Sequence, residues 1–408
     1  MEKNYVFHPL TLPNQETVKN RFFKSAMSES MAKNHQPNTL HYSLYSKWAQ
    51  GGAAIIVTGN VMVNRNHLGE PGNVVLDSNS DLSAFKQWAN SGSQNNAKIW
   101  MQINHPGKQS PRSLSKTPLA PSAIRLKGGM KRFFNTPKAL TNQEVKSVIQ
   151  DYIHAAKLAE KSGFHGVQIH AAHGYLVNQF LSPADNQRAD EYGGDIENRM
   201  RFLTEIFNGI KAGVNKQFSI AIKLNSKDFI DGGFSEQDSI SVIKRMSQLG
   251  IDLIEISGGN YENPVMSKDG RDSKEEGFFI EFAKQIQDIT TVPIVITGGF
   301  RTTKVMNQVL ENSLASMIGL ARPLALYPDI PNQIENQTYT PPKLKRLTTR
   351  VKSLDKKFGS IMGIVYYEQQ MKRVAKGKPP KIHTNAFKPL LHTLFSHGPT
   401  ALKRRRAK

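Results

Sequence analysis

The sequence of 408 residues contains no cysteine. This absence excludes disulfides, thiolate zinc sites, cysteine-ligated iron–sulfur clusters and a cysteine nucleophile. Any redox chemistry must therefore use a non-covalent organic cofactor, or a metal that histidines and carboxylates hold.

The sequence also lacks long apolar runs. No run reaches about eighteen apolar residues, the length that would indicate a membrane-spanning helix. The first residues, MEKNYVFHPLTLPNQ, show neither the basic region nor the apolar region of a signal peptide. We therefore expect a cytoplasmic protein.

Acidic residues are scarce, with 33 Asp and Glu against 54 Lys and Arg, and the formal net charge is +21. Such a charge can indicate nucleic-acid binding. However, residues 341–408 contain 18 basic residues and only two acidic ones, which leaves a net charge of +5 for residues 1–340. The excess charge therefore belongs to the C-terminal segment.

What the sequence does contain is a series of short apolar runs that alternate with helical patterns over residues 1–335. Eight runs are predicted strands: Phe22–Ser25, Ala54–Gly59, Lys98–Asn104, Gly166–His170, Ser219–Leu224, Leu253–Ser257, Pro293–Thr297 and Ser316–Leu320. The alternation predicts an α/β fold. Eight strands favour a closed TIM (β/α)8 barrel over a doubly wound open sheet.

Clear helix signals separate several of these runs. Thr141 and Glu144 have the spacing of a capping box, an apolar face follows at helical spacing, and Gly163 stands where a helix end favours glycine. The segment from Ser235 to Gly250 repeats this plan.

Two segments fall outside the alternation. Residues 106–140 are rich in proline, glycine and lysine, and we predict that they form a lid over the barrel mouth. Residues 336–408 are predicted to form a basic C-terminal extension that is helical in part and packs on the barrel. We expect one helix within residues 361–374 and a short one within residues 390–395.

Polar residues and glycines follow the C-terminal end of every predicted strand. The segments are Ser25–Ser28, Thr58–Gly59, Gln102–His105, His170–His173, Lys223–Asn225, Ser257–Gly259, Thr297–Gly299 and Gly319–Arg322. Active sites of barrels lie at this end of the strands. The sequence therefore predicts one functional site at the barrel mouth.

The segments after the seventh and eighth strands predict a phosphate site. Gly298 and Gly299 lack a Cβ and allow a ligand to approach the backbone, while Arg322 offers a planar cationic group. Barrels frequently bind phosphate between these two loops. The alternative is that the glycines only turn the chain and Arg322 lies on the surface. We favour a phosphorylated cofactor or substrate.

A second cluster follows the fourth strand, where His170, His173 and Tyr175 are close in sequence. Two imidazoles can hold a carbonyl oxygen by hydrogen bonds, and a third group can supply a proton. A metal site is one alternative, but no carboxylate ligand is evident in this stretch. A purely structural role of the histidines is the other.

Several motifs resemble those of the old yellow enzyme family, the FMN-dependent ene-reductases also described as NADH:flavin oxidoreductases. The resemblance covers roughly residues 5–385 and is most specific at residues 166–202, GVQIHAAHGYLVNQFLSPADNQRADEYGGDIENRMRF. The other motifs are VKNRFFKSAMS, MQINHPGK, AIKLNSKDF, ITGGF, IGLARPL and YYEQQMKRVAKGKPP.

The resemblance implies how the chain would hold FMN. Gln102 would bind the pyrimidine edge of the flavin, and Lys223 would place a cation near N1 and O2, where many relatives have arginine. The phosphate would lie between Gly298–Gly299 and Ala321–Arg322, and relatives often have glycine in place of Ala321.

The segment after the first strand is expected to line the isoalloxazine ring of FMN. By the resemblance, Ser25, Ala26 and Met27 would make backbone contacts with the ring. Ser28 would lie near O4 and N5, and since relatives often carry cysteine or threonine at this position, the flavin potential cannot be transferred from them.

The resemblance also implies the reaction. NADH or NADPH would reduce FMN, and His170 and His173 would bind the carbonyl oxygen of an electron-poor alkene. Tyr175 would protonate Cα of this α,β-unsaturated carbonyl compound after hydride has reached Cβ. No metal or iron–sulfur cluster is needed.

Two other functions stay open. The same flavin barrel can oxidise or demethylate an amine, because such enzymes differ only in the substrate pocket. The basic tail, residues 341–408, could bind nucleic acid or an anionic membrane on a non-catalytic barrel. We do not favour the tail hypothesis, because the few aromatic residues there have helical spacing. The sequence leaves open whether the protein is a homo-oligomer.

Overall fold

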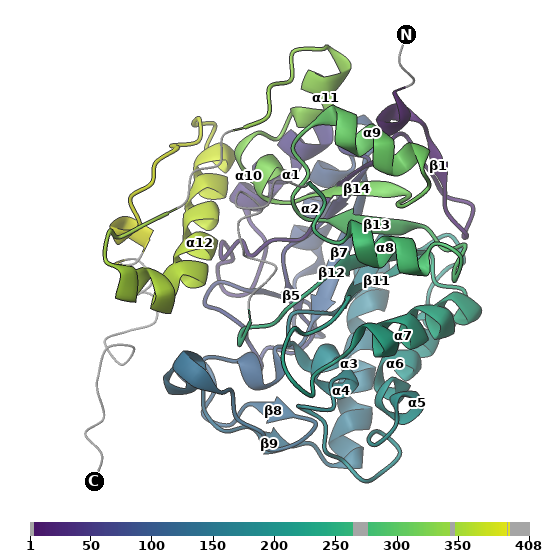
Figure 1. Ribbon diagram of the computed structural model, residues 1–408, viewed down its shortest axis with the longest axis vertical. Coiled ribbons are helices and arrows are strands. Elements are labelled where there is room, and N and C mark those ends of the chain that lie inside the picture. Colours follow the sequence, from purple (N-terminus) through teal and green to yellow (C-terminus); the bar gives the residue numbers. More distant parts are fainter. Residues whose placement is uncertain (1–3, 264–275, 343–346, 390, 392–408) are drawn as a thin grey trace.

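The structure, a computed structural model, describes residues 4–263, 276–342, 347–389 and 391. Its centre is a closed barrel of parallel strands with helices around it (Figure 1). The barrel strands are β3 (Phe22–Lys24), β4 (Ile55–Val57), β7 (Lys98–Asn104), β10 (Gly166–Ala171), β11 (Ser219–Asn225), β12 (Leu253–Ser257), β13 (Ile294–Thr297) and β14 (Met317–Leu320).

The pairing of the strands confirms the barrel and excludes the open sheet. Their order is β10, β11, β12, β13, β14, β3, β4 and β7, every neighbouring pair is parallel, and β7 also pairs with β10. This last pairing closes the sheet. Each strand lies within two residues of a predicted run at either end.

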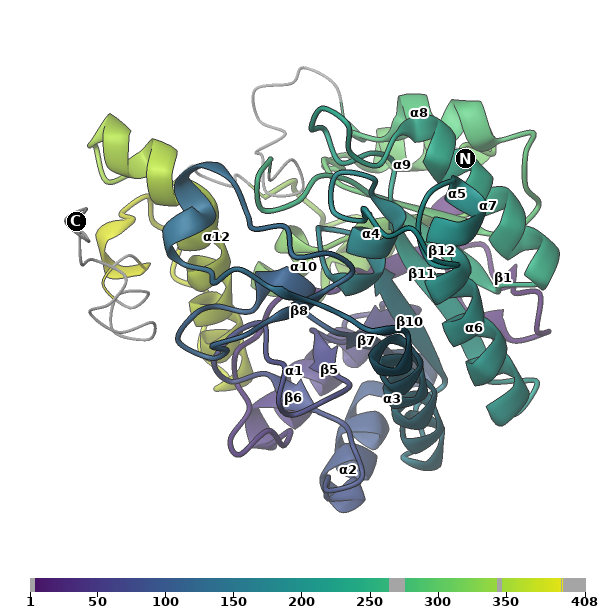
Figure 2. The same ribbon diagram turned by 90° about the horizontal axis from the view of Figure 1, so that it is seen from below.

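The helices surround the barrel (Figure 2). They are α1 (Thr39–Gln50), α2 (Leu82–Gly92), α3 (Asn142–Lys161), α4 (Leu176–Leu181), α5 (Ile196–Arg199), α6 (Arg201–Gly213), α7 (Glu236–Leu249), α8 (Ile280–Ile286), α9 (Thr303–Glu311), α10 (Arg322–Leu326), α11 (Ile330–Glu335) and α12 (Lys352–Ala375). None of the described helices is long and apolar enough to cross a membrane.

The predicted helix signals have the expected geometry. Thr141 caps α3, and its side chain and that of Glu144 bond each other's backbone N–H groups. Gly163 follows the end of α3 with a φ of 85°. Ser235 caps α7 in the same reciprocal manner, and Gly250 ends α7 in the left-handed conformation. Local capping chemistry therefore fixes both ends of these helices.

The barrel strands separate two apolar cores. Residues such as Ile103, Ile169 and Ile254 pack outward against the helices. Alternate strand residues fill the barrel interior: Phe23, Ile55, Val57, Trp100, Ala221, Leu253, Val295 and Met317. The hairpin of β1 (Leu10–Thr11) and β2 (Thr17–Val18) adds Val18 to this inner core and closes the bottom of the barrel. The C-terminal ends of the strands, where barrels carry their active sites, form the opposite end.

Residues 106–140 contain short elements that reach the barrel mouth. They form two 3-10 turns, Gly107–Gln109 and Gly128–Arg132, and the small pair of β8 (Leu119–Ala120) with β9 (Lys138–Ala139). The ring of Phe134 lies 6.1 Å from that of Tyr261 in the loop after β12. This position is compatible with a lid, which stays a prediction.

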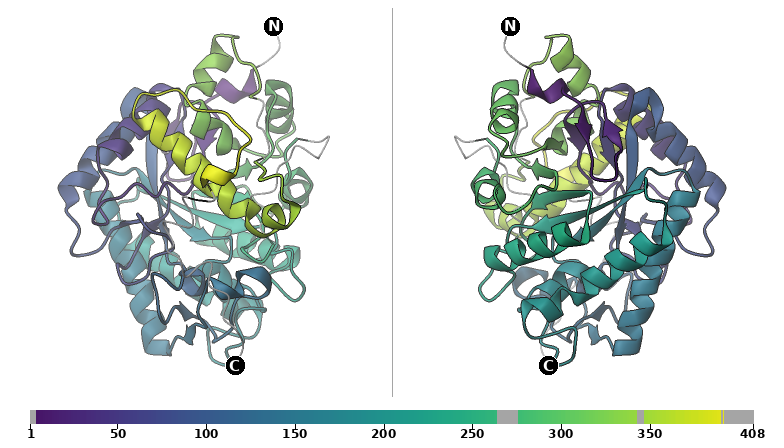
Figure 3. Two further views of the ribbon diagram at one scale, coloured as in Figure 1. Left: turned by 90° about the vertical axis from the view of Figure 1, so that its left-hand side faces the viewer. Right: turned by 90° about the vertical axis from the view of Figure 1, so that its right-hand side faces the viewer.

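The C-terminal extension contributes one long helix. Figure 3 shows α12 running diagonally across one side of the molecule, where it contacts α1 and α10. It begins before the predicted range of residues 361–374 and ends just beyond it. The second predicted helix, residues 390–395, lies outside the described residues apart from residue 391.

Candidate functional site

A polar layer crosses the barrel interior directly above the inner apolar core. Gln102 Nε2 donates to Gln168 Oε1 (2.7 Å), and Gln168 Nε2 donates to Glu255 Oε2 (2.8 Å). The other oxygen of Glu255 lies 3.1 Å from Lys223 Nζ and accepts from Thr297 Oγ1 at 2.7 Å. Five strands therefore hold one hydrogen-bonded chain, which fixes the Gln102 amide and the Lys223 ammonium group in place.

The chain ends at Ser25, which follows β3. Since the Thr297 hydroxyl donates to Glu255, Ser25 Oγ must donate to Thr297 Oγ1, which is 2.8 Å away. Gly319 leaves room for this contact, because a Cβ at that position would overlap Thr297 Oγ1. Ser25 is thus placed by the same layer as the predicted flavin contacts Gln102 and Lys223.

The two histidines form a pair above this layer. His170 Nδ1 accepts from the backbone N–H of Ala172 (3.3 Å), so the neutral ring carries its proton on Nε2. His173 Nε2 lies 2.7 Å from Ser257 Oγ. The ring centres of the two histidines are 5.1 Å apart. His170 Nε2 and His173 Nδ1 remain as potential donors to a bound oxygen.

Electrostatics keep both imidazoles neutral. Burial lowers the pKa of His170 well below its usual range, and His173 and the Lys223 ammonium group lower it further. Burial and Lys223 likewise lower the pKa of His173. The pair can therefore serve as a hydrogen-bond donor set at neutral pH.

Tyr175 completes this cluster. Its ring centre lies 4.8 Å from that of His170, and its hydroxyl oxygen lies 3.0 Å from that of Tyr261. Asn60 Nδ2 donates to the Tyr175 hydroxyl at 3.4 Å. Burial raises the pKa of Tyr175 well above its usual range, and Tyr261 and then Glu70 raise it further. The phenol therefore stays protonated and can serve as a proton donor.

A strained turn presents these side chains. His173 has a φ of 62° and Gly174 a φ of 76°. The backbone N–H of His173 donates to Asn225 Oδ1 (3.2 Å), and that of Gly174 donates to Asn178 Oδ1 (2.7 Å). A left-handed non-glycine residue is costly unless its surroundings hold it, and the two asparagines do so here.

The predicted phosphate loops lie side by side. Thr297 pairs in register with Gly319, so the segments that follow β13 and β14 are neighbours. Gly298 and Gly299 have φ values of 129° and 86°, which side chains rarely allow. Arg322 is the first residue of α10 and is half-buried. The arrangement fits a phosphate group bound by backbone amides and a guanidinium group.

The segment after β3 lies at the same end of the barrel. Ala26, Met27 and Ser28 are half-buried, and Ala26 packs against the inner core. The structure thus brings all thirteen predicted site residues to the C-terminal strand ends. Gly298 and Gly299 suit the approach of a phosphate group, and the buried Gln102 amide and Lys223 ammonium group suit the pyrimidine part of a flavin. The residues present therefore fit FMN.

Sequence reasoning missed four polar residues of this site: Asn60, Gln168, Glu255 and Tyr261. Glu255 gave a signal, because it is an acid within the apolar run LIEIS. Gln168 is two residues before His170 on the same face of β10. Asn60 and Tyr261 lie in loops and gave no signal of their own.

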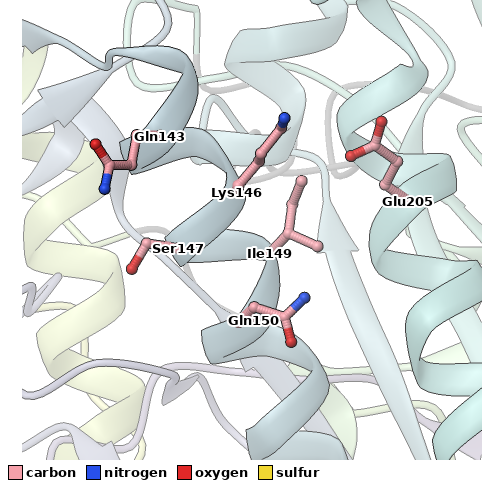
Figure 4. A pocket seen from close by; sticks show the side chains of 6 residues that line it. All are labelled: Gln143, Lys146, Ser147, Ile149, Gln150 and Glu205. Carbon is pink, nitrogen blue, oxygen red and sulfur yellow. The ribbon is translucent and has the colours of Figure 1, made fainter.

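A pocket on the outer helices lies apart from the site. A surface depression of about 380 Å³ lies between α3 and α6, lined by Gln143, Lys146, Ser147, Ile149, Gln150 and Glu205 (Figure 4). These residues belong to the outer helices, away from the strand ends.

Within the described part of the chain, no three His, Asp or Glu side chains are grouped so as to hold a metal ion.

Comparison with known proteins gives one consistent family. The sequence model of the NADH:flavin oxidoreductase / NADH oxidase family matches residues 5–341. An NADH-dependent flavin oxidoreductase of Hypocrea jecorina is 34% identical over 355 residues, which cover 80% of this chain and 88% of the relative. A namesake from Neonectria sp. is 35% identical over 352 residues, 79% of this chain, but this match spans only 46% of that longer protein.

A solved structure agrees with these sequence matches. The old yellow enzyme homologue from Zymomonas mobilis superimposes with a TM-score of 0.70 at 26% identity. The match covers 82% of this chain and 94% of that one.

Proposed function

This chain belongs to the NADH:flavin oxidoreductase / NADH oxidase family, the family of the old yellow enzymes, and on that premise we propose that it reduces the activated carbon–carbon double bond of α,β-unsaturated carbonyl compounds. FMN and NADH or NADPH are the cofactors of this oxidoreductase family. The observation that carries the proposed substrate class is the position of Tyr175, whose ring centre lies 4.8 Å from that of His170, beside the pair of His170 and His173, whose ring centres are 5.1 Å apart.

We assign the polar layer to FMN. Gln102 and Lys223 would bind the pyrimidine part of the flavin, with Lys223 favouring negative charge near N1. Ser25, Ala26, Met27 and Ser28 would line the ring.

The loops after β13 and β14 would hold the other end of the cofactor. Gly298, Gly299, Ala321 and Arg322 would bind its phosphate group. When bound, FMN supplies a carrier that accepts hydride from the nicotinamide and passes it to the substrate.

The imidazole pair would bind the substrate carbonyl. His170 Nε2–H would donate one hydrogen bond to this oxygen, and His173 Nδ1–H would donate the second while its Nε2 accepts from Ser257 Oγ. These hydrogen bonds withdraw electron density through the carbonyl group and make Cβ of the alkene more electrophilic. They also become stronger as the oxygen gains negative charge, which stabilises the transition state. Neutral imidazoles suit this role because they leave their protons in place.

Tyr175 would complete the reaction by protonating Cα. Its pKa, raised by burial, keeps the proton available at neutral pH. The hydroxyl of Tyr261, 3.0 Å away, and the Asn60 amide would orient the Tyr175 hydroxyl and stabilise the oxygen once the proton has left.

A screen of acceptor substrates tests this proposal. The FMN-loaded protein, reduced by NADH without oxygen, is mixed with enones, nitroalkenes and quinones, and the oxidised FMN-loaded protein is mixed with N-methyl amines. We expect enones to be reduced at the double bond, with the saturated carbonyl compound as product. Oxidation of an amine by the oxidised protein, together with failure to reduce any enone, would overturn the proposal in favour of amine oxidation or demethylation.

A further inference from the structure

The C-terminal helix α12 brings a carboxyl group to the barrel mouth. Ser28 Oγ lies 2.6 Å from Glu70 Oε2 and 2.5 Å from Glu368 Oε1, a residue 340 positions away in sequence. Glu368 is 5% exposed, and Ser28 and Glu70 are half-buried. One hydroxyl group therefore stands between two carboxyl groups from separate parts of the chain.

This geometry bears on the number of protons that the three groups hold. A serine hydroxyl has one hydrogen, so Ser28 can donate to only one of its two neighbours. If both carboxyl groups were ionised, the second carboxylate oxygen would face the Ser28 oxygen with no hydrogen between them. One protonated carboxyl group removes this conflict, because it donates to Ser28 Oγ while Ser28 donates to the other carboxylate.

We propose that Glu70 and Glu368 share one proton across Ser28, and that this one-proton carboxyl pair docks α12 on the barrel mouth. Glu368 is then a positioning residue that acts on the site through Ser28, whose hydroxyl has both its hydrogen and a lone pair engaged. The inference goes beyond the proposed reaction, because it involves neither the alkene nor the nicotinamide.

The described groups that face Glu70 carry both signs of charge. Titratable or charged groups face Glu70 from four elements: Glu29 in the segment after β3, Tyr175 at the N-terminus of α4, Tyr261 after β12, and Lys372 one turn further along α12. Lys372 is the cation among these four. Lys372 lowers the pKa of Glu70, whereas Glu29 raises it.

The direction of the Glu70 pKa agrees with the shared proton. Burial raises the pKa of Glu70 and the charge of Glu368 raises it further, against the opposing effects of the Ser28 hydrogen bond and Lys372. The folded protein therefore binds this proton more tightly than the unfolded chain does. The contact contributes stability at low pH, and this contribution is lost as the pH rises through the raised pKa.

The substitution Glu368→Gln tests the proposal. The glutamine amide can donate to Ser28 Oγ as a protonated carboxyl group does, but it has no proton to lose. The FMN-loaded wild type and variant are unfolded in urea at a series of pH values between the ordinary carboxyl pKa of 4.5 and the raised pKa of about 8. For each unit of increasing pH, we expect the folding equilibrium constant of the wild type to fall up to about tenfold further than that of the variant. This is the effect of one proton that the folded protein binds more tightly.

Two further variants make the result decisive. Glu70→Gln should remove the same pH dependence, and it replaces Glu368→Gln as the test if that protein does not fold. Glu281→Gln is the matched control, because this side chain is 80% exposed and pairs only with Lys284 among the described residues; its pH dependence should equal that of the wild type. Equal pH dependence in the wild type and both pair variants would overturn the proposal.

A spectroscopic readout separates a shared proton from simple packing. The infrared spectrum of the wild type should contain the absorption of a buried protonated carboxyl group near neutral pH, and this band should be absent in Glu368→Gln and in Glu70→Gln. A Glu368→Ala variant loses the contact without mimicking the protonated group, so only Glu368→Gln should retain the docking of α12. Absence of the band from the wild type would contradict the shared proton, and this result does not depend on which substrates the enzyme reduces or oxidises.

Discussion

The lower and upper halves of the barrel interior differ in chemistry although the same strands build both. On β7 the interior residue Trp100 is fully buried in an apolar core, and the next interior residue, Gln102, belongs to the polar layer. On β12 Leu253 and Glu255 are related in the same way. Two residues along a strand therefore separate an apolar side chain of the inner core from a polar side chain of the candidate cofactor site. Substitutions in the lower half should affect stability, and those in the upper half should also affect FMN binding.

The largest loss of stability is expected in the lower half. Trp100→Ala removes a fully buried indole ring from the inner core and should lower the free energy of unfolding by about 3–5 kcal/mol. Urea or thermal unfolding measures this. Phe387→Ala is the control, because Phe387 is 45% exposed and its loss should cost less than about 0.5 kcal/mol.

A loss almost as large is expected in the upper half, for an electrostatic reason. Glu255→Gln keeps the size of the side chain but removes the counter-charge of Lys223, leaving that buried ammonium group uncompensated. We expect a loss of about 3 kcal/mol in unfolding free energy, together with weaker binding of FMN measured by fluorescence titration. A variant with wild-type stability and wild-type FMN affinity would show that the polar layer is not organised around this ion pair.

A smaller effect is expected where the layer closes. Gly319→Ala places a methyl group against Thr297 Oγ1 and close to Ser25 Oγ, so one of these hydroxyl groups must move. The cost should be about 1–3 kcal/mol, measured by unfolding. Gly359→Ala is the matched control, because a Cβ at this helical position meets no atom within 4 Å.

The smallest effect concerns the loss of folding stability at acidic pH, to which the buried His170 of the imidazole pair should contribute. The pKa of His170 is lowered by burial in the folded protein, so the unfolded chain takes up a proton below its usual pKa of 6.5 while the folded protein does not. Stability should therefore fall as the pH drops below about 6.5, by up to about 1.4 kcal/mol per pH unit for this group. His170→Gln should show a shallower fall; an unchanged slope would mean that the folded protein protonates His170 freely.

The sequence allowed prediction of the features that local chemistry determines. The eight strands follow from apolar runs, and the ends of α3 and α7 follow from Thr141, Ser235 and Gly250. The site residues could be grouped because the C-terminal ends of barrel strands converge.

Contacts that depend on the closed barrel could not be predicted. The Gln102–Gln168–Glu255 chain requires the register of β7, β10 and β12, and no sequence pattern specifies which polar side chains meet across a barrel. The contact of Glu368 with Ser28 joins residues 340 positions apart through the packing of α12. The domain boundary near residue 335 and the role of each site residue stay predictions.

Rapid-mixing absorbance spectroscopy without oxygen tests most directly the claim that the polar layer serves FMN and the imidazole pair serves the substrate. Wild type and His170→Ala, both loaded with FMN, are first bleached by NADH and then mixed with a simple cyclic enone. We predict similar bleaching of both proteins, followed by a return of colour that is about 10²–10³-fold slower in the variant. Equal return of colour would contradict the assignment of the histidine to the substrate, and protein that cannot be loaded with FMN would contradict the whole account.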